Sequence, residues 1–252
     1  MFDLTGRVAL VTGGNGGIGL GMALGLARIG ARIVVAARDE AKSEAAVRQL
    51  NAIGSDAFSI AVDVTDETSV NGLVAQIVER CGRLDILVNN AGTNIRRPVQ
   101  DLGLDEWHQV MDTNLTSAFL CARAAYPYMK SARRGKVINI GSMLSIFGAG
   151  FAPAYGASKG GIVQLTKSLA VAWAADNIQV NAVLPGWVDT ELTRKARVEV
   201  PDLHERVLSR SPAGRWGVAG DFEGIAAFLA SSQSDFVTGT AIPVDGGYSS
   251  AA

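Results

Sequence analysis

The sequence predicts an α/β protein with a doubly wound sheet of about seven parallel strands and helices on both faces. Short apolar runs rich in valine and isoleucine alternate with longer stretches of helical periodicity along the chain. These runs lack polar alternation, which is typical of strands that are buried on both faces of a parallel sheet. No linker or block of charge divides the 252 residues, so we expect a single domain over residues 1–252.

The elements follow one another in strand–helix order, which implies parallel strands joined by right-handed crossovers. The predicted strands cover residues 8–12, 33–37, 57–62, 84–89, 136–140, 178–184 and 241–244. The helical patterns cover residues 17–29, 40–53, 68–80, about 104–130, 154–175 and 221–230. Residues 190–211 break this rhythm, because they are charged, contain Pro201 and are long for a connection. We expect them to form an insertion that covers a substrate site.

The composition narrows the function classes. With 23 basic and 24 acidic residues the net charge is −1, without the basic excess of a nucleic-acid-binding protein. No apolar run reaches the roughly 18 residues of a membrane span, and no signal peptide is evident. Two cysteines and two histidines at separate positions make no metal-ligand cluster. We therefore expect a cytoplasmic enzyme without a metal, a membrane or nucleic acid as partner.

A glycine-rich turn follows the first strand, where residues 12–19 read TGGNGGIG. In a doubly wound sheet this turn binds the pyrophosphate of a nucleotide, because glycines let the backbone approach and the next helix offers free N–H groups. Two registers fit, one with glycines at 14, 16 and 19 and one with Gly13, Gly17 and Gly19. No Lys-Ser or Lys-Thr follows the glycines, which excludes a P-loop.

The end of the second strand predicts the type of dinucleotide. An acidic residue there favours the ribose 2′-hydroxyl of NAD, whereas an arginine accommodates the 2′-phosphate of NADP. Here the small Ala37 is followed by Arg38 and Asp39, so we expect NADP(H) to be favoured over NAD(H). The alternative is that Arg38 is a solvated neighbour of Asp39, which would then cap the next helix.

Ser142, Tyr155 and Lys159 are candidate catalytic residues. Tyr155 and Lys159 are spaced i,i+4 and share one helix face. A nearby ammonium is expected to lower the pKa of the phenol from its usual value of about 10. Tyr155 would then donate a proton when a carbonyl is reduced and accept one when an alcohol is oxidised. Ser142 follows the fifth strand, at the edge where such sheets bind ligands, and can hold the substrate oxygen.

These motifs together resemble the short-chain dehydrogenase/reductase family over nearly the whole chain. The matching pieces are Thr12–Gly19, Asp63-Val64, Asn89–Gly92, Asn114, Ser142, Tyr155 with Lys159, Pro185-Gly186 with Thr190, and Asp245–Gly247. The resemblance implies a Rossmann fold, hydride transfer between a nicotinamide cofactor and a secondary alcohol or ketone, and a homotetramer. It also selects the register of Gly13, Gly17 and Gly19.

The resemblance further implies residue roles. Asp63 and Val64 would flank the adenine, Asn90 would lie against the ribose, Thr190 would lie near the nicotinamide amide, and Asn114 would anchor a water that links Lys159 to solvent. The remaining expected cofactor residues are Asn15, Ile18, Arg38, Ala91, Gly92, Tyr155, Lys159, Pro185, Gly186 and Val188.

The substrate is suggested by Arg96 and Arg97, which follow the fourth strand. Guanidinium groups match the geometry of a carboxylate, although a solvated pair of arginines is the alternative. Together with residues 142–145 and 212–217, this pair resembles the sugar-acid branch of the family, which implies gluconate or a deoxygluconate as substrate. The expected substrate residues are Arg96, Arg97, Met143 and Trp187.

Two other functions remain open. A 3-oxoacyl-[acyl-carrier-protein] reductase would need a basic patch for its acidic carrier, which Arg123, Lys130, Arg133 and Arg134 can supply. A nucleotide-binding regulator without catalysis would keep the glycine loop but would not need the catalytic residues.

Overall fold

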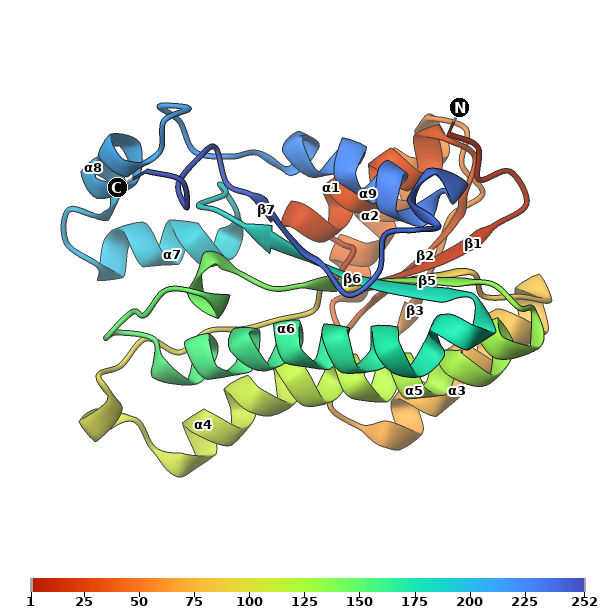
Figure 1. The fold of residues 1–252 in the computed structure, drawn as a ribbon, viewed down its shortest axis with the longest axis horizontal. Coiled ribbons are helices and arrows are strands. Elements are labelled where there is room, and N and C mark those ends of the chain that lie inside the picture. Colours follow the sequence, from red (N-terminus) through yellow and green to blue (C-terminus); the bar gives the residue numbers. More distant parts are fainter. Residues whose placement is uncertain (1, 252) are drawn as a thin grey trace.

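The computed structural model describes residues 2–251, which form one seven-stranded parallel sheet flanked by helices (Figure 1). The strands are β1 (Val8–Thr12), β2 (Arg32–Ala37), β3 (Phe58–Ala61), β4 (Ile86–Asn89), β5 (Gly135–Ile140), β6 (Ile178–Pro185) and β7 (Ala241–Val244). Their order is β3-β2-β1-β4-β5-β6-β7. The winding direction changes between β1 and β4, and doubly wound sheets open a crevice at such a switch point. The predicted fold class is confirmed.

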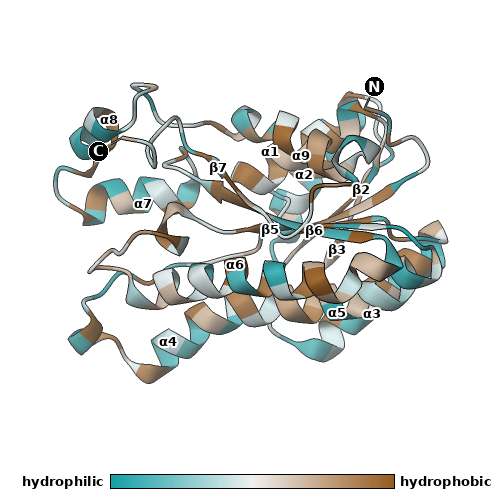
Figure 2. Ribbon diagram, viewed as in Figure 1, coloured by the Kyte–Doolittle hydropathy of each residue, from teal (hydrophilic) through white to brown (hydrophobic). Residues whose placement is uncertain are grey.

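Helices cover both faces of the sheet (Figure 1). One layer contains α1 (Gly17–Arg28), α2 (Glu40–Ala52) and α9 (Glu223–Ala230), and the other contains α3 (Glu67–Cys81), α4 (Leu104–Met111), α5 (Ser117–Ser131) and α6 (Pro153–Trp173). Successive residues of β1 point to opposite layers, so Ala9 and Val11 pack with α1 while Val8 and Leu10 pack with α3 and α5. In Figure 2 the strands are accordingly among the most apolar segments.

The layer of α1 and α9 depends on glycines. A Cβ atom on Gly21 would overlap the carbonyl oxygen of Ala219, and one on Gly25 would overlap the carbonyl oxygen of Glu223. The two backbones therefore approach more closely than side chains would permit. Arg28 on α1 also donates to Glu223 on α9 at 3.0 Å.

The helix expected over residues 104–130 is interrupted, which corrects that prediction. Between α4 and α5, residues Asp112–Thr116 form a π-helical turn. Asn114 lies buried within it, accepts a hydrogen bond from the Thr93 N–H at 2.7 Å and donates to the Thr93 carbonyl at 2.9 Å. A π-turn adds one residue to a helical turn, and such turns are frequent at functional sites.

Residues 190–211 are largely helical, as α7 (Glu191–Glu199) and α8 (Leu203–Arg210). Ala196, Leu203 and Val207 pack against Trp216 in a small apolar cluster of their own. No helix in the described range 2–251 is long and apolar enough to cross a membrane.

Candidate active site

Two cavities meet beyond the carboxyl ends of the central strands. The glycine-loop cleft, of about 540 Å³, extends from residues 13–18 across the end of β4. The insertion cavity, of about 620 Å³, lies between the segment after β5 and the helices α7 and α8. Ser142, Tyr155, Pro185 and Gly186 line both cavities. A ligand in one cavity can therefore meet a ligand in the other beside Ser142 and Tyr155.

The glycine loop leaves the N-terminus of α1 free for an anion. Gly13 and Gly17 have φ of 61° and 51°, a left-handed conformation that favours glycine and supports the register predicted from the resemblance. The helices α2 and α3 are capped by Asp39 and Asp66, but α1 has Gly16 at its N-cap and no acidic residue in its first turn. Its N–H groups and positive dipole end are therefore available to phosphate oxygens.

Asn90 connects the glycine loop to the end of β4. Its Nδ2 donates to the carbonyls of Thr12 and Gly13, both at 3.0 Å. The Thr12 hydroxyl in turn accepts from the N–H groups of Asn90 and Ala91 at 3.0 and 3.1 Å. Gly19 lies directly behind Asn90, where a side chain would overlap Nδ2. Thr12 thus has a structural role that its place in the motif did not specify.

Most of the expected cofactor residues line the cleft. They are Gly13, Asn15, Gly17, Ile18, Asn90, Ala91, Gly92, Tyr155, Lys159, Pro185, Gly186, Val188 and Thr190. Gly19, Arg38, Asp63 and Val64 do not line it. Gly19 supports Asn90 from behind. Arg38 and Asp63 are exposed after β2 and β3. Val64 packs into the apolar cluster on the side of the sheet covered by α3 and α5.

Two further groups at the cleft escaped prediction. Lys42 on α2 donates to Glu191 on α7 at 2.8 Å, and both residues line the cleft. This ion pair connects the insertion to the other side of the cleft. No pattern in either segment indicates that residues so far apart in sequence meet.

Ser142 is held by a turn that is itself attached to α6. Its Oγ accepts from the Leu144 N–H at 3.1 Å, while its own N–H donates to Ser145 Oγ at 3.1 Å. Ser145 Oγ then donates to the Lys159 carbonyl at 2.7 Å. The hydroxyl of Ser145, which was not predicted as a site residue, therefore fixes Ser142 relative to the helix that carries Tyr155.

Lys159 is buried, with its ammonium directed at the end of β5. Nζ donates to the Ile140 carbonyl at 2.7 Å and lies 5.6 Å from the centroid of the Tyr155 ring. A Cβ on Gly92 would lie 3.2 Å from Asn114 Oδ1 and 3.7 Å from Lys159 Nζ, so both polar groups face this glycine. Asn114 Nδ2 also donates to Ser158 Oγ at 3.0 Å. The four expected catalytic residues are thus brought to one region.

Burial dominates the protonation of the Tyr155–Lys159 pair. It raises the pKa of Tyr155, while the Ser142 hydroxyl and the charge of Arg96 act in the opposite direction. It also lowers the pKa of Lys159 to about 8. The expected lowering of the Tyr155 pKa is therefore corrected for the cofactor-free protein, because desolvation outweighs the opposing contributions, which come from Ser142 and Arg96, while the Lys159 ammonium is engaged with a carbonyl. Tyr155 accordingly stays protonated near neutral pH, as a proton donor requires.

We expect Lys159→Met to stabilise the cofactor-free protein at pH 7 by about 1–2 kcal/mol. Holding a charged lysine with a pKa of about 8 in the fold costs about 3 kcal/mol at pH 7, and the lost bond to Ile140 offsets part of that gain. Between about pH 8 and 10.5 this lysine carries a proton in the unfolded chain but has lost it in the folded protein. The stabilisation by Lys159→Met therefore shrinks as pH rises through that window.

Urea unfolding at pH 7 and pH 10 measures this difference. The exposed Lys167 lies on the same helix, and Lys167→Met is the matched control for which we expect little change. An advantage of Lys159→Met that is the same at both pH values would contradict the linkage.

The two arginines predicted to clamp the substrate separate in the structure. Arg96 lines the insertion cavity, but its Nη1 pairs with Glu199 at 2.7 Å and its Nη2 donates to the Leu192 carbonyl at 3.0 Å. Arg97 lies outside the cavity and pairs with Glu106 on α4 at 2.9 Å. The expected arginine pair is therefore not formed.

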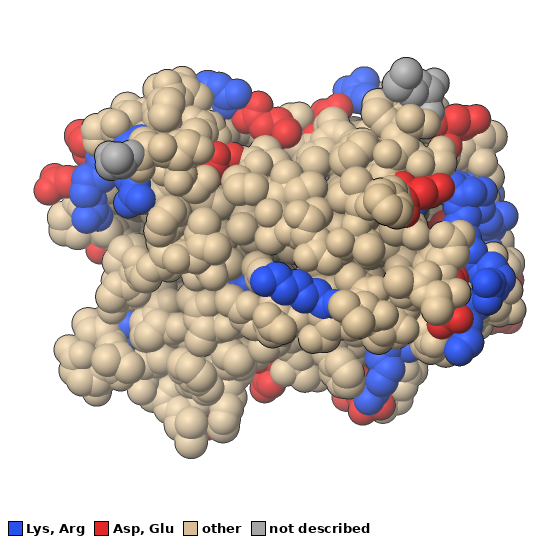
Figure 3. All heavy atoms as spheres, viewed as in Figure 1, with Lys and Arg blue, Asp and Glu red and all other residues tan. Residues whose placement is uncertain are grey.

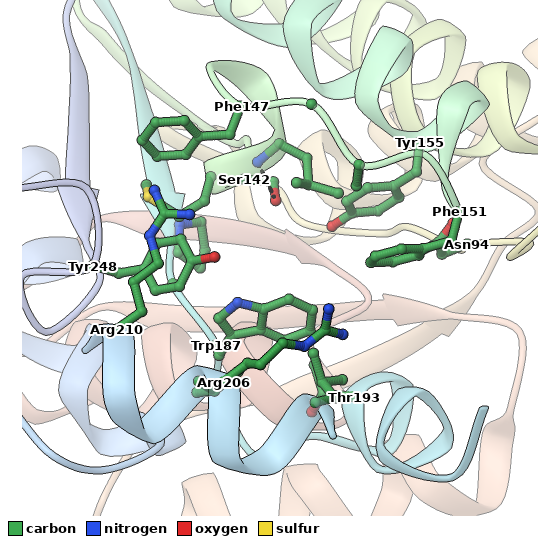
Figure 4. A pocket seen from close by; sticks show the side chains of 18 of the residues that line it. Asn94, Ser142, Phe147, Phe151, Tyr155, Trp187, Thr193, Arg206, Arg210 and Tyr248 are labelled. Carbon is green, nitrogen blue, oxygen red and sulfur yellow. Dashed lines mark hydrogen bonds between the residues drawn. The ribbon is translucent and has the colours of Figure 1, made fainter. Parts of the chain in front are cut away.

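Other predicted and unpredicted residues line the insertion cavity (Figure 4). Met143 and Trp187 lie in its wall as expected. Arg206 and Arg210, on α8, were not predicted, although their i,i+4 spacing within the charged segment was a usable signal. Within residues 2–251 no group of three His, Cys, Asp or Glu side chains is placed to hold a metal ion.

Comparison with known proteins identifies the family. A family model described as enoyl-(acyl carrier protein) reductase matches residues 13–249. The chain belongs to the short-chain dehydrogenase/reductase family. Members of this family are oxidoreductases that use nicotinamide cofactors and act on small-molecule substrates.

Three relatives of this dehydrogenase cover nearly all of its length. The chain is 42% identical to 2-dehydro-3-deoxy-D-gluconate 5-dehydrogenase of Dickeya dadantii, over 98% of this chain and 97% of the relative. It is 39% identical to gluconate 5-dehydrogenase of Gluconobacter oxydans, over 98% and 96%. The crystal structure of a gluconate 5-dehydrogenase from Burkholderia cenocepacia, in complex with NADP and tartrate, is 41% identical over 100% and 98% of the chains, with a TM-score of 0.94.

The glycine-loop cleft fits the nicotinamide dinucleotide of this family. The uncapped and non-acidic N-terminus of α1 suits a pyrophosphate, since both the N–H groups and the dipole favour negative charge. The cleft then extends to Ser142, Tyr155 and Lys159, where the insertion cavity begins. The reactive end of a bound dinucleotide would therefore face the insertion cavity.

Proposed function

We propose that this dehydrogenase transfers a hydride between NADP(H) and the secondary alcohol or ketone of a sugar acid such as gluconate or a deoxygluconate. The observation that carries this proposal is the charge of the insertion cavity. Its lining contains Arg96, Arg206 and Arg210 and, among the described residues, no aspartate or glutamate. Such a cavity favours a small anion, and the relatives named above act on carboxylated sugars.

The chain's own residues account for the proton and for the position of the substrate. The Tyr155 hydroxyl donates its proton to the carbonyl oxygen as that oxygen becomes an alcohol, and it accepts the proton back in the reverse direction. The Ser142 hydroxyl donates a second hydrogen bond to the same oxygen. Lys159, whose Nζ lies 5.6 Å from the centroid of the Tyr155 ring, returns the proton to Tyr155, and Asn114 anchors the water that links Lys159 to solvent. The bound cofactor supplies or accepts the hydride.

The surroundings of β2 support NADP(H) as the favoured cofactor. Asp39, the acidic residue next to the strand end, accepts from the Lys42 N–H at 3.0 Å as the cap of α2. It is therefore engaged where a ribose 2′-hydroxyl would need it. Arg38 is exposed after the small Ala37. Hydrogen bonds from Thr65 lower the pKa of Asp63, and the charge of nearby Arg38 adds to that lowering. A 2′-phosphate could pair with this guanidinium.

The alternative of a 3-oxoacyl-[acyl-carrier-protein] reductase is less favoured by the position of its basic patch. Arg133 and Arg134 precede β5 and so lie at the amino ends of the strands, whereas the two cavities lie beyond the carboxyl ends. Arg123 and Lys130 are paired with Glu67 and Asp176. An acidic carrier held by this patch would not deliver its acyl chain to Tyr155.

Two further expectations are a segment that covers the substrate and a homotetramer. The first is supported by the position of α7 and α8, and the second by exposed apolar residues. Residues of α7 and α8 line the insertion cavity, so segment 190–211 would cover a bound substrate. Phe119 and Tyr128 on α5 and Val171 on α6 are exposed. Figure 3 shows broad areas without charged side chains on one face of the molecule. These surfaces support a homotetramer, because large exposed apolar side chains gain by packing against another subunit.

A substrate panel tests the proposal. We expect 5-keto-D-gluconate to be reduced with a kcat/KM at least tenfold higher than that of acetoacetyl thioesters or simple ketones, and with NADPH preferred to NADH. A tenfold preference needs a difference in transition-state binding of only about 1.4 kcal/mol. Initial rates with every substrate and both cofactors provide the measurement. Higher kcat/KM for the thioester would refute the sugar-acid assignment, and a clear preference for NADH would refute the role of Arg38.

A further inference from the structure

The three arginines of the insertion cavity differ in how they are paired. Arg96 already has two acceptors, Glu199 and the Leu192 carbonyl. Its side chain is only 10% exposed, so it serves mainly to connect the loop after β4 to α7. Across the described residues, the guanidinium groups of Arg206 and Arg210 form no ion pair. The cationic groups available to a ligand are therefore these two.

The local structure of α8 directs both side chains into the same cavity. Leu203, Arg206, Val207 and Arg210 follow one another at helical spacing, and all four line the insertion cavity. Leu203 and Val207 are buried against Trp216, which fixes the rotation of the helix. Figure 4 shows both arginines extending from α8 into the cavity, Arg206 beside Trp187 and Arg210 toward Phe147 and Tyr248.

Aromatic rings hold Arg210 without neutralising its charge. The Arg210 guanidinium carbon lies 4.4 Å from the centroid of the Tyr248 ring and 5.0 Å from that of Phe147. Arg206 lies beside Trp187 in Figure 4. A ring face attracts a cation but leaves its N–H groups free in the plane of the guanidinium, so the donors remain available to a carboxylate.

We propose that Arg206 and Arg210 form the carboxylate-binding pair of the insertion cavity. This proposal rests on the proposed function and names the residues that select acids over neutral sugars. The two guanidinium groups together supply enough donors for both carboxylate oxygens. The reacting hydroxyl or carbonyl, further along the same chain, then lies at Ser142 and Tyr155.

The experiment compares D-gluconate with D-gluconamide, which differ only in the carboxylate. We expect the double variant Arg206→Ala/Arg210→Ala to raise KM for gluconate about 100-fold and each single variant about tenfold, since charge-assisted hydrogen bonds are lost. KM for gluconamide should change little. Replacement of both arginines by lysine should restore part of the affinity, because the charge returns without the paired donors.

Lys195→Ala is the matched control. It also removes one positive charge from the insertion, but Lys195 is exposed on α7 and does not line the cavity. An equal rise in KM for both ligands in the double variant, or an equal effect of Lys195→Ala on gluconate, would overturn the proposal. Thermal unfolding of each variant shows whether the fold is retained.

Calorimetric titration of the cofactor-loaded protein with D-gluconate separates this proposal from the proposed function. Binding that weakens in the double variant, without turnover of any sugar acid by the unaltered protein, would contradict the function but support the pair. Turnover of sugar acids that is insensitive to the double substitution would contradict the pair alone.

Discussion

Tyr155→Phe is expected to reduce turnover about 10²- to 10⁴-fold, the range that general acid–base catalysis contributes. The substitution removes the hydroxyl that lies where the two cavities meet and retains the ring that fills the site. Because burial raises the pKa of this phenol, Tyr155 holds its proton near neutral pH. Among the expected catalytic residues, only Ser142 has another hydroxyl that could take over the proton transfer.

The readouts separate chemistry from binding. Fluorescence titration with NADPH should give a dissociation constant within a few-fold of the original, because the glycine loop is untouched. Tyr128→Phe, at an exposed position on α5, is the matched control and should keep its turnover. If Tyr155→Phe keeps more than about a tenth of the original kcat, Tyr155 is not the proton donor.

Gly19→Ala is expected to destabilise the cofactor-free protein by about 1–3 kcal/mol and to weaken cofactor binding more than tenfold. The added methyl group would overlap Asn90 Nδ2 and lie 2.5 Å from the Gly13 carbonyl oxygen. Asn90 cannot turn aside without losing its bonds to Thr12 and Gly13, so the loop itself must shift. Urea unfolding and NADPH titration measure the two effects.

Gly72→Ala is the matched control for this change. Gly72 also lies within a helix, α3, but nothing lies within 4 Å of the position that its Cβ would take. Alanine there should stabilise the protein by roughly 0.5–1 kcal/mol, through better helix propensity and a less flexible unfolded chain. If both substitutions stabilised the protein, the close approach behind the glycine loop would not be a constraint.

Local patterns predicted most of the fold because the parallel strands are largely apolar, although β5 and β6 also bury Asn139 and Asn181. The predicted first and last strands, residues 8–12 and 241–244, coincide with β1 and β7. Periodicity could not reveal the π-turn around Asn114, since one extra residue in a long helix leaves the apolar pattern readable on both sides of it. The family resemblance named Asn114 as a site residue, and the structure places its side chain near Lys159, but the resemblance did not indicate that backbone geometry.

The grouping of the candidate catalytic residues was predictable because their spacing is local, whereas the arginines that line the insertion cavity were not predictable. Tyr155 and Lys159 lie one helical turn apart, and Ser142 directly follows a strand. Arg96 and Arg97 are adjacent in sequence, yet they pair with carboxylates on different helices, Glu199 on α7 and Glu106 on α4. Only the packing of α8 against Trp216 determines that Arg206 and Arg210 face the cavity.

The contact between α1 and α9 also has a consequence for biosynthesis. Arg28 and Glu223 are 195 residues apart, so the helix that begins at the glycine loop receives its packing partner only after a long further stretch of chain has been translated. At about 5–20 residues per second, the ribosome delivers that partner roughly 10–40 s after α1 has been made. During this interval the nascent chain exposes the apolar surface of α1 that α9 later covers.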